Sequence, residues 1–117
     1  MEKEIEKMRA ELLADIWQNH KQFLRDEKVK KSDIVDYVEN IIEPMDEWDN
    51  MHYYGGYFRA LEAVEKQKTF SDDEFDIIFE ALDFLATDYA ENSTLTMRQK
   101  KAMIKNITLL ETKLNKI

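Results

Sequence analysis

The sequence predicts an all-α protein, a compact bundle of about five amphipathic helices that forms one domain over residues 1–117. Three observations carry this prediction. The chain has only two glycines and one proline, and 36% of its residues are charged, a composition that favours long helices over sheet. Apolar residues recur at spacings of three and four, which is the period of one helix face. The segments between these stripes are short and polar, as in helix bundles.

The first helix is expected over residues 3–25 and the second over 32–42. The apolar stripe of the first consists of Ile5, Met8, Leu12, Ile16, His20 and Phe23. The apolar face of the second consists of Ile34, Tyr37 or Val38, and Ile41. Ser32 is expected to cap the second helix through its side-chain oxygen. Pro44 then interrupts the pattern or begins the next helix.

A third helix is expected from about residues 44–47 to 67, and it contains both glycines of the chain, Gly55 and Gly56. Two glycines inside a helix cost roughly 2 kcal/mol relative to alanine, so they need a reason. Three explanations remain open. They let another helix backbone pack closely, which we favour, or they mark a kink, or they clear space beside His52 for a partner.

The fourth and fifth helices have the clearest start signals. Ser71 and Glu74 match a capping box, in which the two residues bond to each other's backbone N–H groups. Phe70 and Phe75 occupy the two positions of a hydrophobic staple around it. A second capping box, Thr96-x-x-Gln99, begins the last helix. The stripes that follow are Phe75, Ile78, Leu82, Leu85 and Tyr89, then Met103, Ile107, Leu110, Leu114 and Ile117.

Composition limits the compartment and the chemistry. Cysteine is absent, which excludes disulfides, thiolate zinc sites and cysteine nucleophiles. The first residues, MEKEIEKM, lack the apolar segment of a signal peptide. The longest stretch without a charged residue, 50–58, is too short to span a membrane. We therefore expect a cytoplasmic protein with no membrane segment and no cofactor, and we leave homo-oligomer formation open.

The net charge of −8 is unevenly distributed. Residues 32–50 and 71–92 contain acids but no Lys or Arg, whereas residues 93–117 hold six bases and one acid, Glu111. Either the acidic helices pair with the basic last helix, or they form a surface that attracts a basic protein partner. An acidic chain repels phosphate, so we do not expect direct nucleic-acid binding. The exception would be a small basic patch formed by Arg98, Lys100, Lys101 and Lys105.

Aromatic residues crowd the start of the third helix. Tyr53 and Tyr57 lie one turn apart on a face beside the core stripe, and Trp48 precedes them. Tyr and Trp are frequent interface anchors. We therefore expect Trp48, Tyr53 and Tyr57 to be exposed anchors, with Asp46 and Asp49 beside them. In the alternative, both tyrosines pack under the first or last helix.

The main functional interpretation is a non-catalytic role, in which the acidic surface binds and inhibits or regulates a basic protein. In size and charge the chain is similar to helical immunity proteins and to the nucleic-acid-mimicking inhibitors of phages. This likeness implies an acidic helical surface that occupies the basic groove of its partner.

Paired acids on two helices give an enzymatic alternative. Glu62-x-x-Glu65 and Glu80-x-x-Asp83 resemble the Glu-x-x-Glu and Glu-x-x-Asp pairs of the all-α nucleoside triphosphate pyrophosphatases, the MazG-like family. The resemblance implies that Glu62, Glu65, Glu80 and Asp83 hold Mg²⁺, which binds the triphosphate and activates water.

A second alternative rests on one histidine. His52 precedes the small residue Gly56 by four positions on a helix, which resembles the arrangement in histidine phosphotransfer domains. The resemblance covers about five residues and implies that His52 accepts a phosphoryl group while the glycine lets a response regulator approach.

Overall fold

Helices make up nearly all of the part of the chain that the structure, a computed structural model, describes: residues 2–40, 50–91 and 95–116. The elements are α1 (Glu2–Asp26), a 3-10 turn η1 (Lys31–Asp33), α2 (Ile34–Glu39), α3 (Asn50–Lys66), α4 (Asp72–Glu91) and α5 (Met97–Leu114). The described residues contain no strand. The predicted all-α bundle of about five helices is therefore confirmed.

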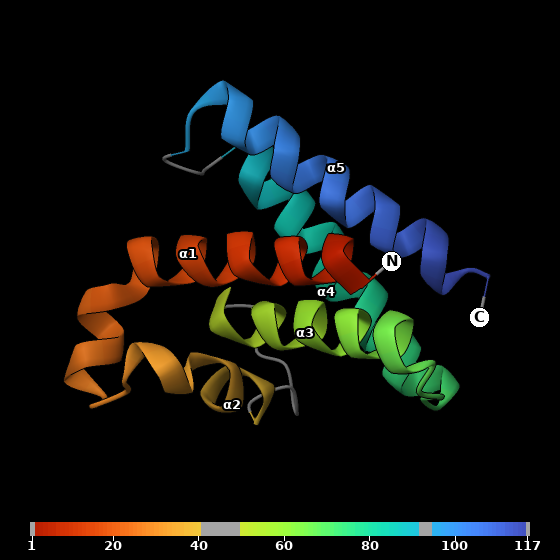
Figure 1. Cartoon of the computed structure of the whole chain (residues 1–117), viewed down its shortest axis with the longest axis horizontal. Helices are drawn as coiled ribbons and strands as arrows, with labels where there is room; N and C mark the ends of the chain where they lie inside the picture. Colours follow the sequence, from red (N-terminus) through yellow and green to blue (C-terminus); the bar gives the residue numbers. More distant parts are fainter. Residues whose placement is uncertain (1, 41–49, 92–94, 117) are drawn as a thin grey trace.

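Helix α3 lies at the centre of the bundle. It packs against α1, α2, α4 and α5, and Figure 1 shows α1 on one side of it, α2 on the other and α4 crossing behind. This position explains why α3 is apolar on more than one face, since a helix that packs against others on several sides buries more than one face. Its buried side chains include Tyr53, Tyr54, Tyr57, Phe58, Ala60, Leu61, Ala63 and Val64.

Close packing explains Gly56. A Cβ atom at this position would overlap the Cβ of Ala81 on α4, and the Cα atoms of Ile78 and Ala81 would lie only 3.8 Å from it. Helix α3 continues from Asn50 to Lys66 through both glycines. The favoured explanation, a close helix crossing, is confirmed for Gly56, and the chain does not break there.

Both predicted capping boxes are present. Ser71 Oγ accepts the Glu74 backbone N–H at 3.2 Å, and Glu74 Oε1 accepts the Ser71 N–H at 3.1 Å. Thr96 and Gln99 make the same reciprocal pair at 3.2 and 3.0 Å. The rings of Phe70 and Phe75 meet edge to face with centroids 5.7 Å apart, as expected for the staple. Local sequence signals therefore determine where α4 and α5 begin.

Two details of the first half differ from the sequence prediction. Phe23 is 43% exposed, although the stripe of the first helix was expected to bury it; the neighbouring Leu24 is buried. Ser32 does not cap α2: it lies inside η1, where the Asp33 N–H donates to the Lys30 carbonyl, and α2 begins without a side-chain cap. A tight turn has replaced the expected first turn of helix. The expected helical residues beyond Asn40, including Pro44, lie outside the described residues.

Candidate functional site

Two of the predicted aromatic anchors, Tyr53 and Tyr57, do not lie on the surface of the protein. Tyr53 and Tyr57 are buried, at 3% and 0% exposure, so the expectation that they are exposed is wrong. Tyr53 stacks on Phe84 of α4 with ring centroids 4.0 Å apart. The physical reason is the central position of α3, which leaves neither tyrosine face open to solvent. The other three candidates, Trp48, Asp46 and Asp49, lie outside the described residues.

An acidic stripe runs along α4. Asp73, Asp76, Glu80 and Asp83 follow one another at spacings of three and four, which places them on one helix face, and all four are exposed. The ion pairs of the described residues lie elsewhere, joining Arg9 to Glu65, Arg59 and Lys68 to Glu62, and Lys113 to Glu4. Among those residues, the acids of α4 are therefore not neutralised by the basic α5.

Glu111 of α5 extends this stripe. Its carboxyl group hydrogen-bonds with that of Asp83, and the pKa of Glu111 is raised, first by burial and then by repulsion from Asp83. Two carboxyl groups hydrogen-bond to each other only when one of them holds a proton. We call Asp73, Asp76, Glu80, Asp83 and Glu111 the acidic face. It is a surface whose negative charge is not met by a base among the described residues.

The four carboxylates of the pyrophosphatase alternative do not come together. Glu62 accepts a hydrogen bond from Lys68 Nζ at 2.9 Å and pairs with Arg59 at 3.4 Å, and the Lys68 hydrogen bond lowers its pKa. Glu65 pairs with Arg9 of α1 at 3.0 Å. Glu80 and Asp83 belong to the exposed acidic face. No group of three or more His, Asp or Glu side chains suited to a metal occurs among the described residues.

The phosphotransfer alternative rests on His52, whose side chain lies outside the described part of the structure. The helix that carries it begins two residues earlier, at Asn50.

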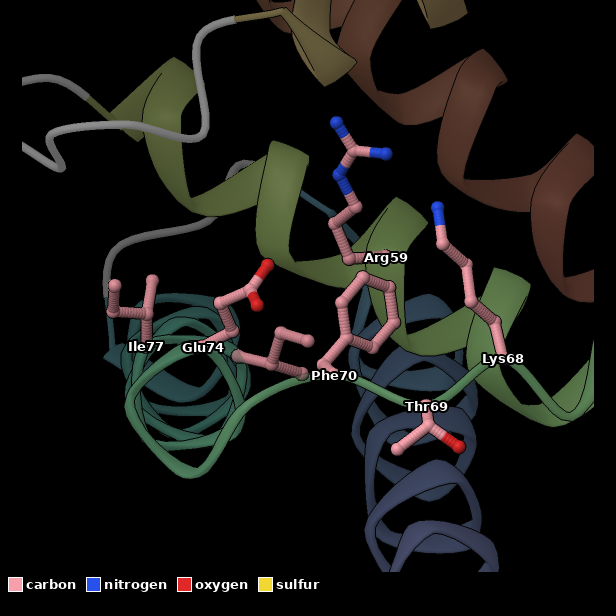
Figure 2. Close-up of a pocket in the computed structure, with 7 residues that line it drawn as sticks. Arg59, Lys68, Thr69, Phe70, Glu74 and Ile77 are labelled. Atoms are coloured by element: carbon pink, nitrogen blue, oxygen red, sulfur yellow. The ribbon is translucent and has the colours of Figure 1, made fainter.

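A small pocket of about 280 Å³ lies beside the segment between α3 and α4 (Figure 2). Arg59 and Lys68 lie on its rim, with Phe70 below. Both bases already have partners, since both bind Glu62 and Arg59 Nη2 also donates to the Glu39 carbonyl of α2 at 3.2 Å. Lys68 Nζ lies 5.3 Å from the Phe70 ring centroid. This arrangement joins α2, α3 and the segment before α4, and we assign it a structural role.

A larger groove, about 670 Å³, lies between α1 and the first half of α5. Its walls are formed by Glu11, Ala14, Asp15, Gln18, Leu95, Arg98, Gln99, Ala102 and Met103. The volume falls within the range of small-molecule sites, roughly 300–1,000 Å³. Sequence reasoning missed this groove. The available signal was Asp15, which interrupts the apolar stripe between Leu12 and Ile16.

Asp15 is a buried charged residue, with 5% exposure. Tyr89 Oη donates to its Oδ2 at 2.7 Å, and Asn19 Nδ2 donates to its Oδ1 at 2.6 Å. Burial raises the pKa of Asp15, and these hydrogen bonds and the nearby His20 oppose the shift. His20 in turn meets the Tyr54 ring edge to face, at 5.5 Å. A polar network therefore runs from the groove wall into the core.

No protein-family model matches the chain, and neither does any curated protein or solved structure.

No described helix combines the length and the apolar character needed to cross a membrane.

Proposed function

We propose that this protein binds a basic protein partner through its acidic face and acts by occupying the partner's basic surface. The proposed role is non-catalytic and needs no metal or cofactor. Occupation of a basic surface blocks it to other ligands, so the role includes inhibition or regulation of the partner. We place this activity in the cytoplasm.

One observation carries the proposal: Asp73, Asp76, Glu80 and Asp83 of α4 are exposed and not paired with bases among the described residues. A protein that used these acids only for its own stability would set them against the six bases of residues 93–117. Instead, Lys113 reaches Glu4 of α1, and the base-free segment 71–92 faces solvent along Asp73, Asp76 and Glu80. Unpaired like charges on one face attract and orient an oppositely charged partner.

The Asp83–Glu111 contact supports the same proposal. Burial and then repulsion from Asp83 raise the pKa of Glu111, so the Glu111 carboxyl group gives up its proton less readily than an exposed glutamate does. A Lys or Arg side chain placed between them would replace the proton and make charge-assisted hydrogen bonds to both carboxylates. This pair is therefore the proposed centre of the acidic face.

Because Tyr53 and Tyr57 are buried, they are not available to contact the proposed partner. With no aromatic anchor from these positions, charge carries a larger share of recognition, and binding should weaken as salt screens it. Phe79, which is partly buried on α4, is available at the edge of the acidic face as an apolar contact.

Affinity capture from the native cell tests the proposal. The wild-type chain should retain a basic protein at low ionic strength and release it at about 1 M salt, where the screening length falls to about 3 Å. A triple variant, Asp76→Asn, Glu80→Gln and Asp83→Asn, should lose that protein. The matched control removes three other exposed acids, Glu6→Gln, Asp26→Asn and Glu27→Gln, and should retain it.

The same experiment can reject the proposal. Equal capture of the partner by the wild-type chain and the triple variant would exclude the acidic face as the binding site. Equal loss in both variants would show that only net charge matters, which would also exclude a specific face.

A further inference from the structure

Two exposed helix faces, one on α1 and one on α5, carry bases and no acid. Along α1, exposed residues follow one another at spacings of three and four: Lys7, Ala10, Ala14, Gln18, Lys21 and Arg25. The same spacing along α5 gives a second exposed series: Arg98, Lys101, Lys105, Thr108 and Thr112. Residues at these spacings share one face of a helix, so each helix presents a stripe whose charges are all positive.

The two stripes flank the groove between α1 and α5. In Figure 1, α5 lies close to the start of α1 near the two chain ends and diverges from α1 toward its own start. Ala14 and Gln18 of the α1 stripe and Arg98 of the α5 stripe all line the groove. The acids of the groove belong to neither stripe: Asp15 is buried with both oxygens hydrogen-bonded, and Glu11 is partly buried. We call the bases of both stripes the basic face: Lys7, Lys21, Arg25, Arg98, Lys101 and Lys105.

The basic face has no acidic counterpart among the described residues. The bases that form ion pairs in that part of the chain are Arg9, Arg59, Lys68 and Lys113. Arg25 lies 6.0 Å from the centroid of the Trp17 ring, which is a contact with a neutral group. The acidic face of α4 is equally without bases. The folded chain therefore presents one basic and one acidic face, on different helices, and neither neutralises the other.

The two faces are complementary in sign and in spacing. The acids of α4 and the bases of α5 both recur at three and four residues, so successive charges lie about 5 Å apart along each helix. Opposite charges arranged on two surfaces attract and orient the molecules that carry them. A second copy of the chain offers each face the charge that it lacks.

We propose that the basic face of α1 and α5 binds the acidic face of a second copy of this chain. In this contact, α4 of one copy lies over the groove of the other, between the bases of α1 and those of α5. The contact needs no other protein, but it uses the acidic face to which the proposed function assigns the basic partner. A second copy and the partner therefore compete, and partner binding should dissociate the self-associated chain.

Analytical ultracentrifugation of the purified full chain tests the proposal. At about 20 mM salt the weight-average mass should exceed that of one chain as the protein concentration rises toward about 1 mM, since exposed ion pairs are individually weak. At about 1 M salt, where the screening length is about 3 Å, the mass should return to that of one chain. A mass of one chain at every concentration and low salt would overturn the proposal.

An acid variant separates a specific contact from an effect of net charge. The triple variant of Asp76, Glu80 and Asp83 makes the net charge of −8 less negative. If net charge alone governed association, this variant would repel itself less and associate more than the wild type. The proposal requires the opposite, a mass of one chain under conditions in which the wild type associates. The control variant used for partner capture loses the same charge from other exposed positions and should associate like the wild type.

A base variant, Lys21→Gln, Arg98→Gln, Lys101→Gln, should also remain a single chain when alone. Mixed in equal amounts, the acid variant and the base variant should form a complex of two chains. The reason is that the acid variant keeps the basic face and the base variant keeps the acidic face. Only exposed side chains change, so circular dichroism should show the helix content of the wild type in both variants. Absence of a complex in the mixture would overturn the proposal.

The control for the base variant replaces three exposed bases outside the basic face, Lys30→Gln, Lys66→Gln and Lys116→Gln. It carries the same net charge as the base variant and should associate like the wild type. An equal loss of association in the control and the base variant would show that position does not matter, which also overturns the proposal.

A nucleic acid is the other occupant that a basic face could take. A single-stranded DNA of about 20 nucleotides is the probe, since proteins bind single strands through positively charged grooves. Binding of this DNA to the wild type and the acid variant but not to the base variant, with the chain alone monomeric, would overturn self-association in favour of a nucleic-acid site. A monomeric chain that still captures a basic partner through the acidic face would overturn this inference and leave the proposed function intact.

Discussion

Asp15 is a carboxyl group whose buried position in the fold raises its pKa. It is buried at the groove wall, where Tyr89 and Asn19 bind its two oxygens. Desolvation dominates over these hydrogen bonds, so its pKa is higher than the ordinary 3.8. The folded chain therefore binds this proton more tightly than the unfolded chain.

That difference predicts how stability depends on pH. The contribution of the Asp15 proton is complete below pH 3.8 and is lost as the pH rises through the higher pKa of the folded state. Asp15→Asn has no such proton. Urea unfolding at about pH 4 and about pH 7 should therefore show a smaller fall in the free energy of unfolding in the variant than in the wild type. Glu6→Gln, which removes an exposed carboxyl group from the same helix, is the control. Identical falls in wild type and Asp15→Asn would contradict this account.

Some of the residues that matter in this fold could be recognised from the sequence, and others could not. Gly56 was visible because glycine inside a helix needs a reason. Asp15 was visible only as a break in a stripe, since its burial depends on Tyr89, 74 positions away. The buried tyrosines were misassigned for a related reason. A sequence shows that Tyr53 and Tyr57 share a face, but not how many helices surround that face.

At the scale of the helices, the crossing of α3 and α4 depends on the missing side chain of Gly56. In Gly56→Ala the new Cβ would overlap Ala81 Cβ, so the helices must separate. Overpacking of this kind costs about 1–3 kcal/mol, more than the roughly 1 kcal/mol that alanine adds to helix propensity. Denaturant unfolding should therefore give a lower free energy of unfolding for the variant.

The matched test is the double variant Gly56→Ala, Ala81→Gly, which moves the methyl group from one helix to the other. It should recover part of the lost stability, because the two residues are in direct contact and their effects are not additive. A stabilising effect of Gly56→Ala alone, as helix propensity predicts, would rule out the tight crossing.

At the end of α1, a substitution is expected to raise the free energy of unfolding rather than lower it. Lys28 has φ of 61°, and the Val29 and Lys28 N–H groups bond the carbonyls of Leu24 and Arg25 at 2.8 and 2.9 Å. This is the Schellman arrangement, in which glycine is preferred at the left-handed position. Lys28→Gly should raise the free energy of unfolding by about 0.5–1 kcal/mol, because it removes the strain of a side chain there.

Lys21→Gly is the control for that substitution, since Lys21 is exposed in the interior of the same helix. It should lower the free energy of unfolding by about 1 kcal/mol. Equal destabilisation by glycine at both positions, measured in urea, would show that Lys28 is not strained. The starts of α4 and α5 were well predicted from the sequence, because the caps at Ser71 and Thr96 are made by residues three positions apart.

At the scale of the whole molecule, the architecture separates three regions. The buried α3 holds the bundle together, the wedge between α1 and α5 contains a groove with two carboxylates, and α4 presents the acidic face. Charge segregation along the sequence indicated that an acidic surface was one of two outcomes. Only the packing of the helices could decide between them, because the choice depends on which helices are neighbours and which faces they turn outward.

The most direct measurement of the central claim is the association rate of the captured basic partner with the wild type, the triple variant of Asp76, Glu80 and Asp83, and the control with three other acids removed. If the acidic face steers the partner, the triple variant should associate at least about tenfold more slowly at low salt and depend less on ionic strength, while the control keeps the rate of the wild type. Equal rates for all three proteins across the salt series would contradict the claim.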